Sequence, residues 1–286
     1  MNLALIGVGL IGGSFARAVR AAGRVNRIVG FDMQPEALQR ALELGVIDDI
    51  ALSAAHAVAN ADLVMIATPV GGMRAVLREI APHLRSAAII TDVGSTKTGV
   101  IEAARAELAA AFERFVPAHP IAGSERSGLE YSDSSLFRGT VCIITLSRDT
   151  DSNAARQVES LWNDIGCTVE QMSSEEHDHV FAAVSHLPHL LAFAFVAQIA
   201  SDKDAKRKFA FAGPGFRDFT RIAASSPSMW SDICISNRSA ISSELRTHRE
   251  LLTELQRAID EGDAESLRRV FQQAAMARRG ISVSVE

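Results

Sequence analysis

The chain has 286 residues, enough for one large domain or two of ordinary size. Hydrophobic residues make up 48% and charged residues 22%, which is normal for a globular protein. The formal net charge is -5 and no dense basic block is present, which argues against nucleic acid because such a partner requires a cationic surface.

Cysteine usage and hydropathy favour a cytoplasmic protein. The three cysteines are widely spaced, match no zinc-binding pattern and suit a reducing compartment. The apolar N-terminus lacks the basic region of a signal peptide and is interrupted by glycines. No uninterrupted apolar run has the length expected of a membrane span. We therefore expect a cytoplasmic location, no targeting segment, no membrane contact and no bound metal.

A glycine-rich motif follows the first apolar run. Residues 3–6 are continuously apolar, as in a central parallel strand, and the sequence GVGLIG at 7–12 leads into a helical pattern. In this G-x-G-x-x-G context the first glycine allows a tight turn, the second admits a pyrophosphate and the third lets helix and strand pack closely. The helix N-terminus then faces the phosphates. The candidate cofactor-binding residues are Gly7, Gly9, Leu10, Ile11 and Gly12.

An acidic residue indicates which dinucleotide binds. Asp32 ends the next predicted strand, residues 27–31, and lies twenty positions after Gly12. A carboxylate there accepts hydrogen bonds from the adenosine ribose and repels a 2′-phosphate, so we predict NAD rather than NADP. A chance turn followed by a surface acid is the alternative, but strand, motif, helix, strand and acid occur in the required order.

Strands and helices alternate up to about residue 172. Further strands are predicted at 61–67, 87–91, 115–118, 140–146 and 168–172, and helices at 35–44, 73–84 and 151–165. This alternation predicts a doubly wound α/β fold with a parallel sheet. Thr68 follows one of these strands and is a further candidate cofactor contact.

From Ser174 the strand-like runs disappear and helical periodicity takes over, broken at 213–215 by Gly-Pro-Gly. We therefore predict a Rossmann-type NAD-binding domain at 1–172 and an all-α substrate and dimerisation domain at 173–286. The helices hold more Leu, Ile, Ala and Phe than one small domain needs. This favours a homodimer, with a thick monomer core as the alternative.

The ends of two predicted strands carry candidate catalytic residues. His119 follows the strand at 115–118, and ligands of parallel sheets bind at the carboxyl ends of strands. Ser95 follows the strand at 87–91 and can reach the same crevice. The ordinary role of a serine at such a position is to cap the following helix, and one side chain can do both.

The helical half carries histidines and arginines that suit a ligand site. His186 and His189 share one helix face beside Pro188, which should kink or open that helix. They lack a third metal ligand nearby, so we expect them to line a site. Arg221 suits a carboxylate clamp, and Asp218, three residues earlier, can orient it. A surface ion-pair face is the alternative, but the aromatic neighbours Phe216, Phe219 and Trp230 favour partial burial.

Five segments together carry a family resemblance: GVGLIGGS at 7–14, DVGSTK at 92–97, HPIAGSE at 119–125, SHLPH at 185–189, and FRDFTRIA at 216–223 with Trp230. In this order they resemble the prephenate/arogenate (cyclohexadienyl) dehydrogenases of tyrosine biosynthesis. The first segment alone is weak, since any Rossmann oxidoreductase can carry it, whereas the full series is specific. The resemblance spans the chain from its N-terminus to the middle of the helical half.

The resemblance implies oxidative decarboxylation of prephenate or arogenate by NAD, giving 4-hydroxyphenylpyruvate or tyrosine. It implies that His119 accepts the proton of the ring hydroxyl, that Ser95 holds the same hydroxyl and that Arg221 binds a substrate carboxylate. A neutral imidazole is the active form of such a base, so activity should rise with pH through the histidine range. The remaining implied site residues, which line the pocket, support it or gate it, are His189, His186, Trp230, Glu125 and Asp218.

Several points stay open at this stage. The chain ends just after its last predicted helix, so we expect any tyrosine inhibition to act at the active site. A β-hydroxyacid dehydrogenase or a pyrroline-carboxylate reductase is the nearest alternative, although these place a lysine or another polar group at the reacting centre. A non-catalytic NAD-sensing protein is a further alternative, but it has no need of His119, Ser95 and Arg221. The choice between prephenate and arogenate is undecided.

Overall fold

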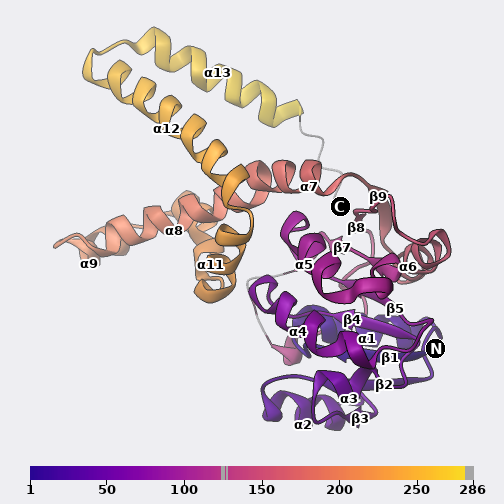
Figure 1. The fold of residues 1–286 in the computed structure, drawn as a ribbon. Coiled ribbons are helices and arrows are strands. Elements are labelled where there is room, and N and C mark those ends of the chain that lie inside the picture. The colour runs from indigo at the N-terminus through magenta and orange to yellow at the C-terminus, as the bar shows by residue number, and fades with distance from the viewer. Residues whose placement is uncertain (124–125, 127, 281–286) are drawn as a thin grey trace. The chain divides into compact units, whose positions relative to one another are not determined.

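The computed structural model describes residues 1–123, 126 and 128–280. The chain divides into two compact units, Met1–Arg238 and Ser239–Glu286. The first unit holds both sheets and the helices up to α11, most of which are labelled in Figure 1. The second holds nearly all of α12 and all of α13. The domain boundary expected near residue 172 stays a prediction, because the packing groups α7 to α11 with the sheets.

A six-stranded parallel sheet in the order β3-β2-β1-β4-β5-β6 forms the centre of the first unit. This order, with β1 at the switch point, confirms the doubly wound fold. The strands are β1 (Asn2–Ile6), β2 (Arg27–Phe31), β3 (Asp49–Ile50), β4 (Leu63–Ile66), β5 (Ile89–Asp92) and β6 (Phe115–Val116).

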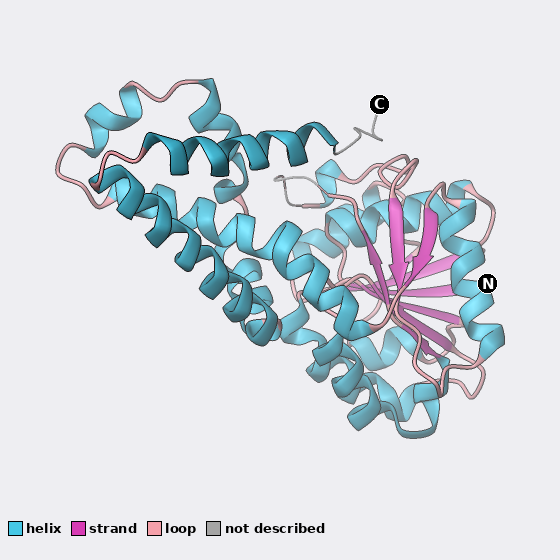
Figure 2. Ribbon diagram, turned by 90° about the horizontal axis from the view of Figure 1, so that it is seen from above, coloured by secondary structure: helices cyan, strands magenta, loops and turns pink. Residues whose placement is uncertain are grey.

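Two hydrophobic cores cover the two faces of this sheet. Leu3 and Leu5 of β1 belong to one core, whereas Ala4 and Ile6 belong to the other. This division follows from the alternation of side chains along a strand, and it explains why the strand is apolar throughout. Helices lie on both sides of the strands in Figure 2.

The helices of the first unit connect and extend this arrangement. Asp151 and Ser173 cap the helices that follow them, and their side chains accept hydrogen bonds from backbone N–H groups of the first turn. The helices are α1 (Leu10–Ala21), α2 (Pro35–Glu43), α3 (Ala54–Val58), α4 (Met73–Ile80), α5 (Thr98–Leu108), α6 (Ser152–Asp164), α7 (Ser174–Phe181), α8 (Leu187–Ala200), α9 (Ala205–Ala210), α10 (Pro214–Thr220) and α11 (Pro227–Ser236).

The strand expected at 115–118 is in fact two strands in two sheets. β6 ends at Val116, and β7 (Ala118–Pro120) begins a second sheet with β8 (Val141–Ile144) and β9 (Thr168–Gln171). Pro117 separates them, because proline lacks the N–H that would continue the ladder. β7 runs antiparallel to β8 and pairs His119 with Ile143. His119 is therefore a strand residue, and not the first residue of a loop.

The segment Ser174–Ala200 contains the proline predicted to open its helix. A π-helical turn, Ala182–His186, separates α7 from α8 just before Pro188, as expected for a helix disturbed by proline. By length and composition alone the segment is apolar enough to cross a membrane, although polar residues such as His186, His189 and Gln198 interrupt its apolar run. Its His177, Asp178 and His186 are buried within the first unit.

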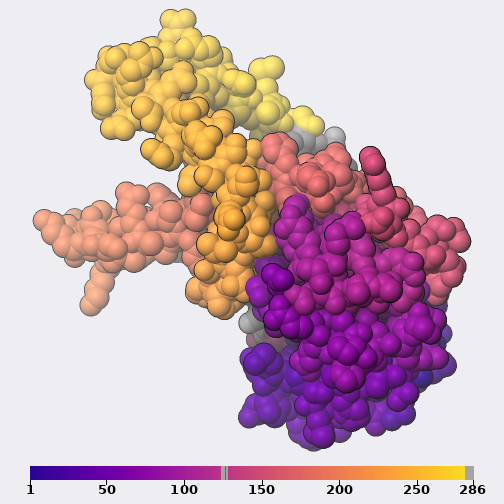
Figure 3. Space-filling view, in the orientation of Figure 1, coloured from indigo at the N-terminus to yellow at the C-terminus, as the bar shows by residue number. Residues whose placement is uncertain are grey.

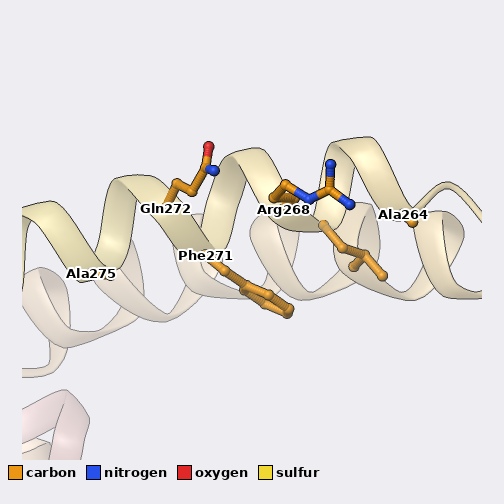
Figure 4. Close-up of a pocket in the computed structure, with 6 residues that line it drawn as sticks. Ala264, Arg268, Phe271, Gln272 and Ala275 are labelled. Carbon is orange, nitrogen blue, oxygen red and sulfur yellow. The ribbon is translucent and has the colours of Figure 1, made fainter.

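The second unit is a pair of helices, α12 (Arg238–Asp260) and α13 (Ala264–Gly280), joined by a turn at Gly262 with a φ of +69°. Glycine suits this turn because a residue with a Cβ is strained at such a φ. Figure 4 shows Phe271 on one side of α13, where it lines an open apolar groove with Ala264, Leu267, Arg268, Gln272 and Ala275.

Candidate active site

The glycine-rich turn has the geometry that a dinucleotide requires. Gly7 has a φ of +96°, and a Cβ there would lie 2.5 Å from the carbonyl oxygen of Ala67. A Cβ on Gly12 would lie 2.1 Å from the carbonyl oxygen of Gly7, so helix and strand can pack this closely only with glycine. A Cβ on Gly9 would meet no described atom within 4 Å. Gly9 is the N-cap of α1, whose first turn carries Leu10 and Ile11, and it therefore leaves open space where a pyrophosphate can approach.

Asp32 and Thr68 lie beside this turn. The Asp32 carboxylate accepts hydrogen bonds from Val8 N at 2.8 Å and from Gln34 N at 2.9 Å, which hold it next to the glycines. Each oxygen has a second lone pair to offer a ribose hydroxyl. The Oγ1 atom of Thr68 is buried and has no hydrogen-bond partner among the described residues. A buried hydroxyl without a partner is costly, so these residues fit a bound dinucleotide that supplies the missing contact.

His119 lies on β7 and contacts a second histidine. Its Nδ1 atom is 2.8 Å from Nε2 of His177, and the ring of Phe181 packs edge-on against it with centroids 4.9 Å apart. Burial lowers the pKa of His119 well below its usual value, and the nearby His177 and Lys97 lower it further. His119 is therefore neutral at pH 7, the form that can accept a proton.

A buried ion pair fixes the backbone just before His119. Lys97 and Asp92 are fully buried, with 2.6 Å between Nζ and Oδ2. Lys97 Nζ donates to the carbonyl oxygen of Ala118 at 2.7 Å, and the N–H of Ala118 donates to Asp92 at 3.2 Å. The pair therefore binds both the carbonyl oxygen and the N–H of Ala118, and it connects β7 to the end of β5. Sequence reasoning placed Lys97 in a motif but missed this role.

Ser95 lies half-buried in the loop between β5 and α5, and it does not cap α5. That helix begins at Thr98 with Lys97 as its N-cap, and no side-chain cap by Lys97 is present in the described structure. The backbone N–H groups of Lys97 and Thr98 instead donate to the two oxygens of Asp178, at 2.8 and 2.9 Å. The capping role expected of Ser95 is thus filled by a carboxylate from α7.

His186, His189 and Trp230 form one cluster. His186 is buried against the backbone of Ser95, and burial lowers its pKa to about 4. His189 stacks on Trp230 with ring centroids 3.7 Å apart, and its Nδ1 is 2.9 Å from the carbonyl oxygen of Ser185. The indole Nε1 of Trp230 is buried, with no hydrogen-bond acceptor in the described part of the chain. An indole nitrogen in this setting can donate to a ligand oxygen.

The remaining candidates differ in their placement. Arg221 begins a 3₁₀ turn after α10, and its charge, secondary to burial, helps to lower the pKa of His189. It therefore lies near the histidine and tryptophan cluster, but it is exposed, as is Phe219, so the partial burial expected for both residues was wrong. Asp218 is exposed on α10. Glu125 lies outside the described residues.

Sequence reasoning missed His177 and Asp178. Both are buried on α7, where His177 Nδ1 is 2.8 Å from Asp178 Oδ1. An isolated His-Asp pair near a helix start is a weak signal, because acidic residues there are ordinarily explained by the helix dipole. His177 contacts His119, which lies 58 residues earlier in the chain. Asp178 contacts Thr98 at the start of α5, which lies 80 residues earlier.

Fold and site together define a class of protein. A glycine-rich dinucleotide turn follows β1, a neutral histidine lies on β7 next to the end of β5, and helices from the second half of the chain carry the other candidate residues. This is the arrangement of an NAD-dependent dehydrogenase with a nucleotide-binding half and a helical half.

Comparison with known families gives a narrower assignment. The family model described as "Prephenate dehydrogenase, nucleotide-binding domain" matches residues 15–171. The model described as "Prephenate dehydrogenase, dimerization domain" matches residues 173–273. The chain therefore belongs to the prephenate dehydrogenase family, and the β-hydroxyacid dehydrogenase, pyrroline-carboxylate reductase and NAD-sensing alternatives are set aside.

Individual relatives agree with the assignment. The chain is 38% identical to prephenate dehydrogenase of Bacillus subtilis over 98% of this chain and 76% of the relative. It is 34% identical to cyclohexadienyl dehydrogenase of Zymomonas mobilis over 97% and 94%. A crystal structure of prephenate dehydrogenase from A. aeolicus with hydroxyphenyl propionate and NAD+ is similar with a TM-score of 0.91 and 37% identity, covering 99% of this chain and 98% of that one.

Proposed function

We propose that the protein oxidises and decarboxylates prephenate, arogenate or both, with NAD as hydride acceptor, to give 4-hydroxyphenylpyruvate or tyrosine. The observation that carries this proposal is the position and charge state of His119. It lies on β7 next to the loop that carries Ser95, and burial lowers its pKa so that it is neutral. The relatives add support, because they include both prephenate and cyclohexadienyl dehydrogenases, and the A. aeolicus enzyme binds NAD+ and a hydroxyphenyl ligand.

The chemistry that NAD supplies when bound is acceptance of a hydride from the carbinol carbon of the ring. Aromatisation drives the loss of carbon dioxide, so the protein's main tasks are to position the substrate and to remove the hydroxyl proton. In our proposal His119 accepts that proton and Ser95 hydrogen-bonds to the same hydroxyl. The residues that hold the cofactor are Gly7, Gly9, Leu10, Ile11, Gly12, Asp32 and Thr68, with Ser95 at the border of the two sites.

The helical half binds the rest of the substrate in this proposal. Arg221 pairs with a carboxylate, because a permanently charged guanidinium can donate two parallel hydrogen bonds. The stacked His189 and Trp230 form an apolar wall with an N–H donor, and His186 closes the pocket beside Ser95. Asp218 orients or gates Arg221 from the rim of the site. Glu125 is proposed as a second gating residue from the family motif alone.

A homodimer is the proposed assembly. Large apolar side chains on or next to the helices following α7 are exposed, including Phe195, Phe211 and Phe219. Figure 3 shows the surface of α8 and α9 open to solvent, and the family model for this region is described as a dimerization domain. A second copy is the simplest cover for so much apolar surface. We propose a cytoplasmic location from the cysteine usage, and a domain boundary near residue 172 from the end of the strand-like runs.

Tyrosine is proposed to inhibit at the active site, because it carries the same two groups as the reaction product. In this proposal His119 binds its aromatic hydroxyl and Arg221 binds its carboxylate. Inhibition by tyrosine that is competitive with substrate is the expected pattern. Inhibition that substrate cannot overcome would contradict this part of the proposal.

The deciding experiment measures NADH or NADPH formation by the purified protein, with prephenate and arogenate each offered with NAD and with NADP. We expect turnover with NAD, and the ratio of the two kcat/KM values then names the preferred substrate. The His119→Asn variant is the matched control, because its NAD affinity should be unchanged. Demonstrable NAD binding without turnover of either substrate would overturn the proposed function.

A further inference from the structure

Asp178 receives hydrogen-bond donors on both of its oxygens. Oδ1 accepts from the backbone N–H of Lys97 at 2.8 Å and lies 2.8 Å from His177 Nδ1, while Oδ2 accepts from the N–H of Thr98 at 2.9 Å. Burial alone raises the pKa of Asp178, but the hydrogen bonds from His177, Lys97 and Thr98 prevail and hold it below its usual value. Asp178 is therefore ionised at pH 7 and can only accept hydrogen bonds.

This carboxylate determines where the protons lie on both histidines. His177 Nδ1 must carry a proton, because it faces an ionised oxygen. Burial lowers the pKa of His177, so the ring is neutral and its Nε2 has no proton. That nitrogen lies 2.8 Å from Nδ1 of His119, which must therefore be the donor. Since His119 is also neutral, its proton is on Nδ1 and its Nε2 carries a free lone pair.

We propose that His177 and Asp178 are positioning residues that fix the tautomer of His119, so that Nε2 is the atom that accepts the hydroxyl proton. This inference rests on the proposed function, since it gives a task to the free nitrogen. In the other tautomer two unprotonated nitrogens would face each other at 2.8 Å. Phe181 packs against both rings, with centroids 4.9 Å from His119 and 4.5 Å from His177, and limits their rotation.

The charged groups around His119 and His177 also affect how easily His119 accepts a proton. The charges and titratable groups that face His119 or the histidine next to it are Lys97, His177, His186, Asp92 and Asp178. Lys97 opposes a positive charge on His119, while Asp178 favours it through His177. Replacing Asp178 with a neutral residue should therefore lower the pKa of His119 further and reduce its strength as a base.

A direct test is ¹⁵N NMR of the wild-type protein labelled at histidine, with His119 assigned from the His119→Asn variant. The two ring nitrogens have distinct shifts, so the tautomer is read without any turnover. We expect His119 protonated on Nδ1 and bare on Nε2. The reverse tautomer would refute the inference even if the enzyme turns over prephenate. Conversely, the expected tautomer in a protein that turns over neither substrate would overturn the proposed function and, with it, the task of Nε2, and would leave only the tautomer assignment.

Two variants of one residue supply the kinetic test. His177→Gln places an amide oxygen near the former Nε2 and keeps an acceptor for His119, whereas His177→Asn reaches only as far as the former Nδ1 and removes that acceptor. Loss of the carboxylate that orients the histidine of a Ser-His-Asp triad costs about 10⁴ in kcat. We expect His177→Asn to lose about 10²-fold or more in kcat, with the substrate KM and NAD affinity nearly unchanged, because a general base contributes about that much.

His177→Gln should retain kcat within about tenfold of wild type, since one neutral hydrogen bond is preserved. Equal losses in the two variants, or full activity of His177→Asn, would contradict the inference. Asp178→Asn gives an independent readout: the acidic limb of the kcat/KM profile should move to lower pH. If the acidic limb of the kcat/KM profile does not move in Asp178→Asn, the Asp178 carboxylate has only a structural role. Thermal unfolding of each variant identifies any that fails to fold, and the wild-type NMR result then decides.

Discussion

Replacing Lys97 with methionine should destabilise the protein strongly, because it removes one partner of a buried ion pair. Both Lys97 and Asp92 have no exposed side-chain surface, and 2.6 Å separates the charged atoms. Removing one member of such a pair leaves a buried charge and costs about 3–5 kcal/mol. Asp92 keeps hydrogen bonds from the N–H groups of Gly94 and Ala118, which places the expected loss at the lower end of that range. The whole protein has only about 5–15 kcal/mol to lose.

Urea unfolding at a fixed protein concentration, followed by tryptophan fluorescence, measures this loss. Arg40→Met is the matched control, since the Arg40–Glu43 pair is exposed and such pairs contribute little. Lys97→Met combined with Asp92→Asn should be more stable than Lys97→Met alone, because no unpaired charge remains. A loss below about 1 kcal/mol in Lys97→Met, or a double variant less stable than the single one, would refute the reasoning.

Further predictions concern the cofactor and the base. His119→Asn should lose about 10²–10⁴-fold in kcat with unchanged NAD affinity, measured by steady-state kinetics and by NAD titration. Because burial holds the pKa of His119 well below 6.5, kcat/KM should stay high at pH 6.5 and fall only in more acidic buffer, below the ordinary histidine range in which the sequence alone placed the change; a limb at or above 6.5 would contradict this. Asp32→Ala should weaken NAD binding and relax discrimination against NADP, and an unchanged cofactor preference would rule out its ribose contact. Gly12→Ala should abolish NAD binding, because the added Cβ would lie 2.1 Å from Gly7 O.

The lowered pKa values also predict how stability depends on pH. His119, His177 and His186 are all neutral in the folded protein at a pH where the unfolded chain binds protons. A group whose pKa is lower when folded contributes stability that is present above its unfolded pKa of about 6.5 and is lost as the pH falls. The free energy of unfolding should therefore decrease from pH 7 to pH 5.

The dinucleotide half of the site could be predicted from the sequence because its causes are local. The tight turn, the open approach at Gly9 and the close packing at Gly12 each depend on residues within one strand, turn and helix. The parallel sheet followed from continuously apolar runs, since a strand covered on both faces has no polar side. Pro117 was also a local signal of a break between two strands. The apolar run from Phe115 to Ala118 was nevertheless interpreted as one strand, so the second sheet was not predicted.

The catalytic half could be predicted only in part, because its contacts join distant segments. His119 was predicted from its position after a strand, whereas His177 meets it from a helix 58 residues further on. Nothing in the spacing of His177 and Asp178 indicates which strand or loop they will touch. Their roles follow only from three-dimensional distances between N–H donors and carboxylate or imidazole acceptors.

Asp178 lies in the second half of the chain, but its contacts determine the arrangement of candidate site residues in the first half. A helix that starts within a loop leaves N–H groups without partners, and a nearby serine such as Ser95 is the usual solution. Here the N–H groups of Lys97 and Thr98 use the carboxylate of Asp178, so the Ser95 hydroxyl is not required as a cap. The same carboxylate orients His177 and, through it, His119. In our proposal, one buried charge on α7 thus leaves the serine available for the substrate hydroxyl and prepares the histidine to take its proton.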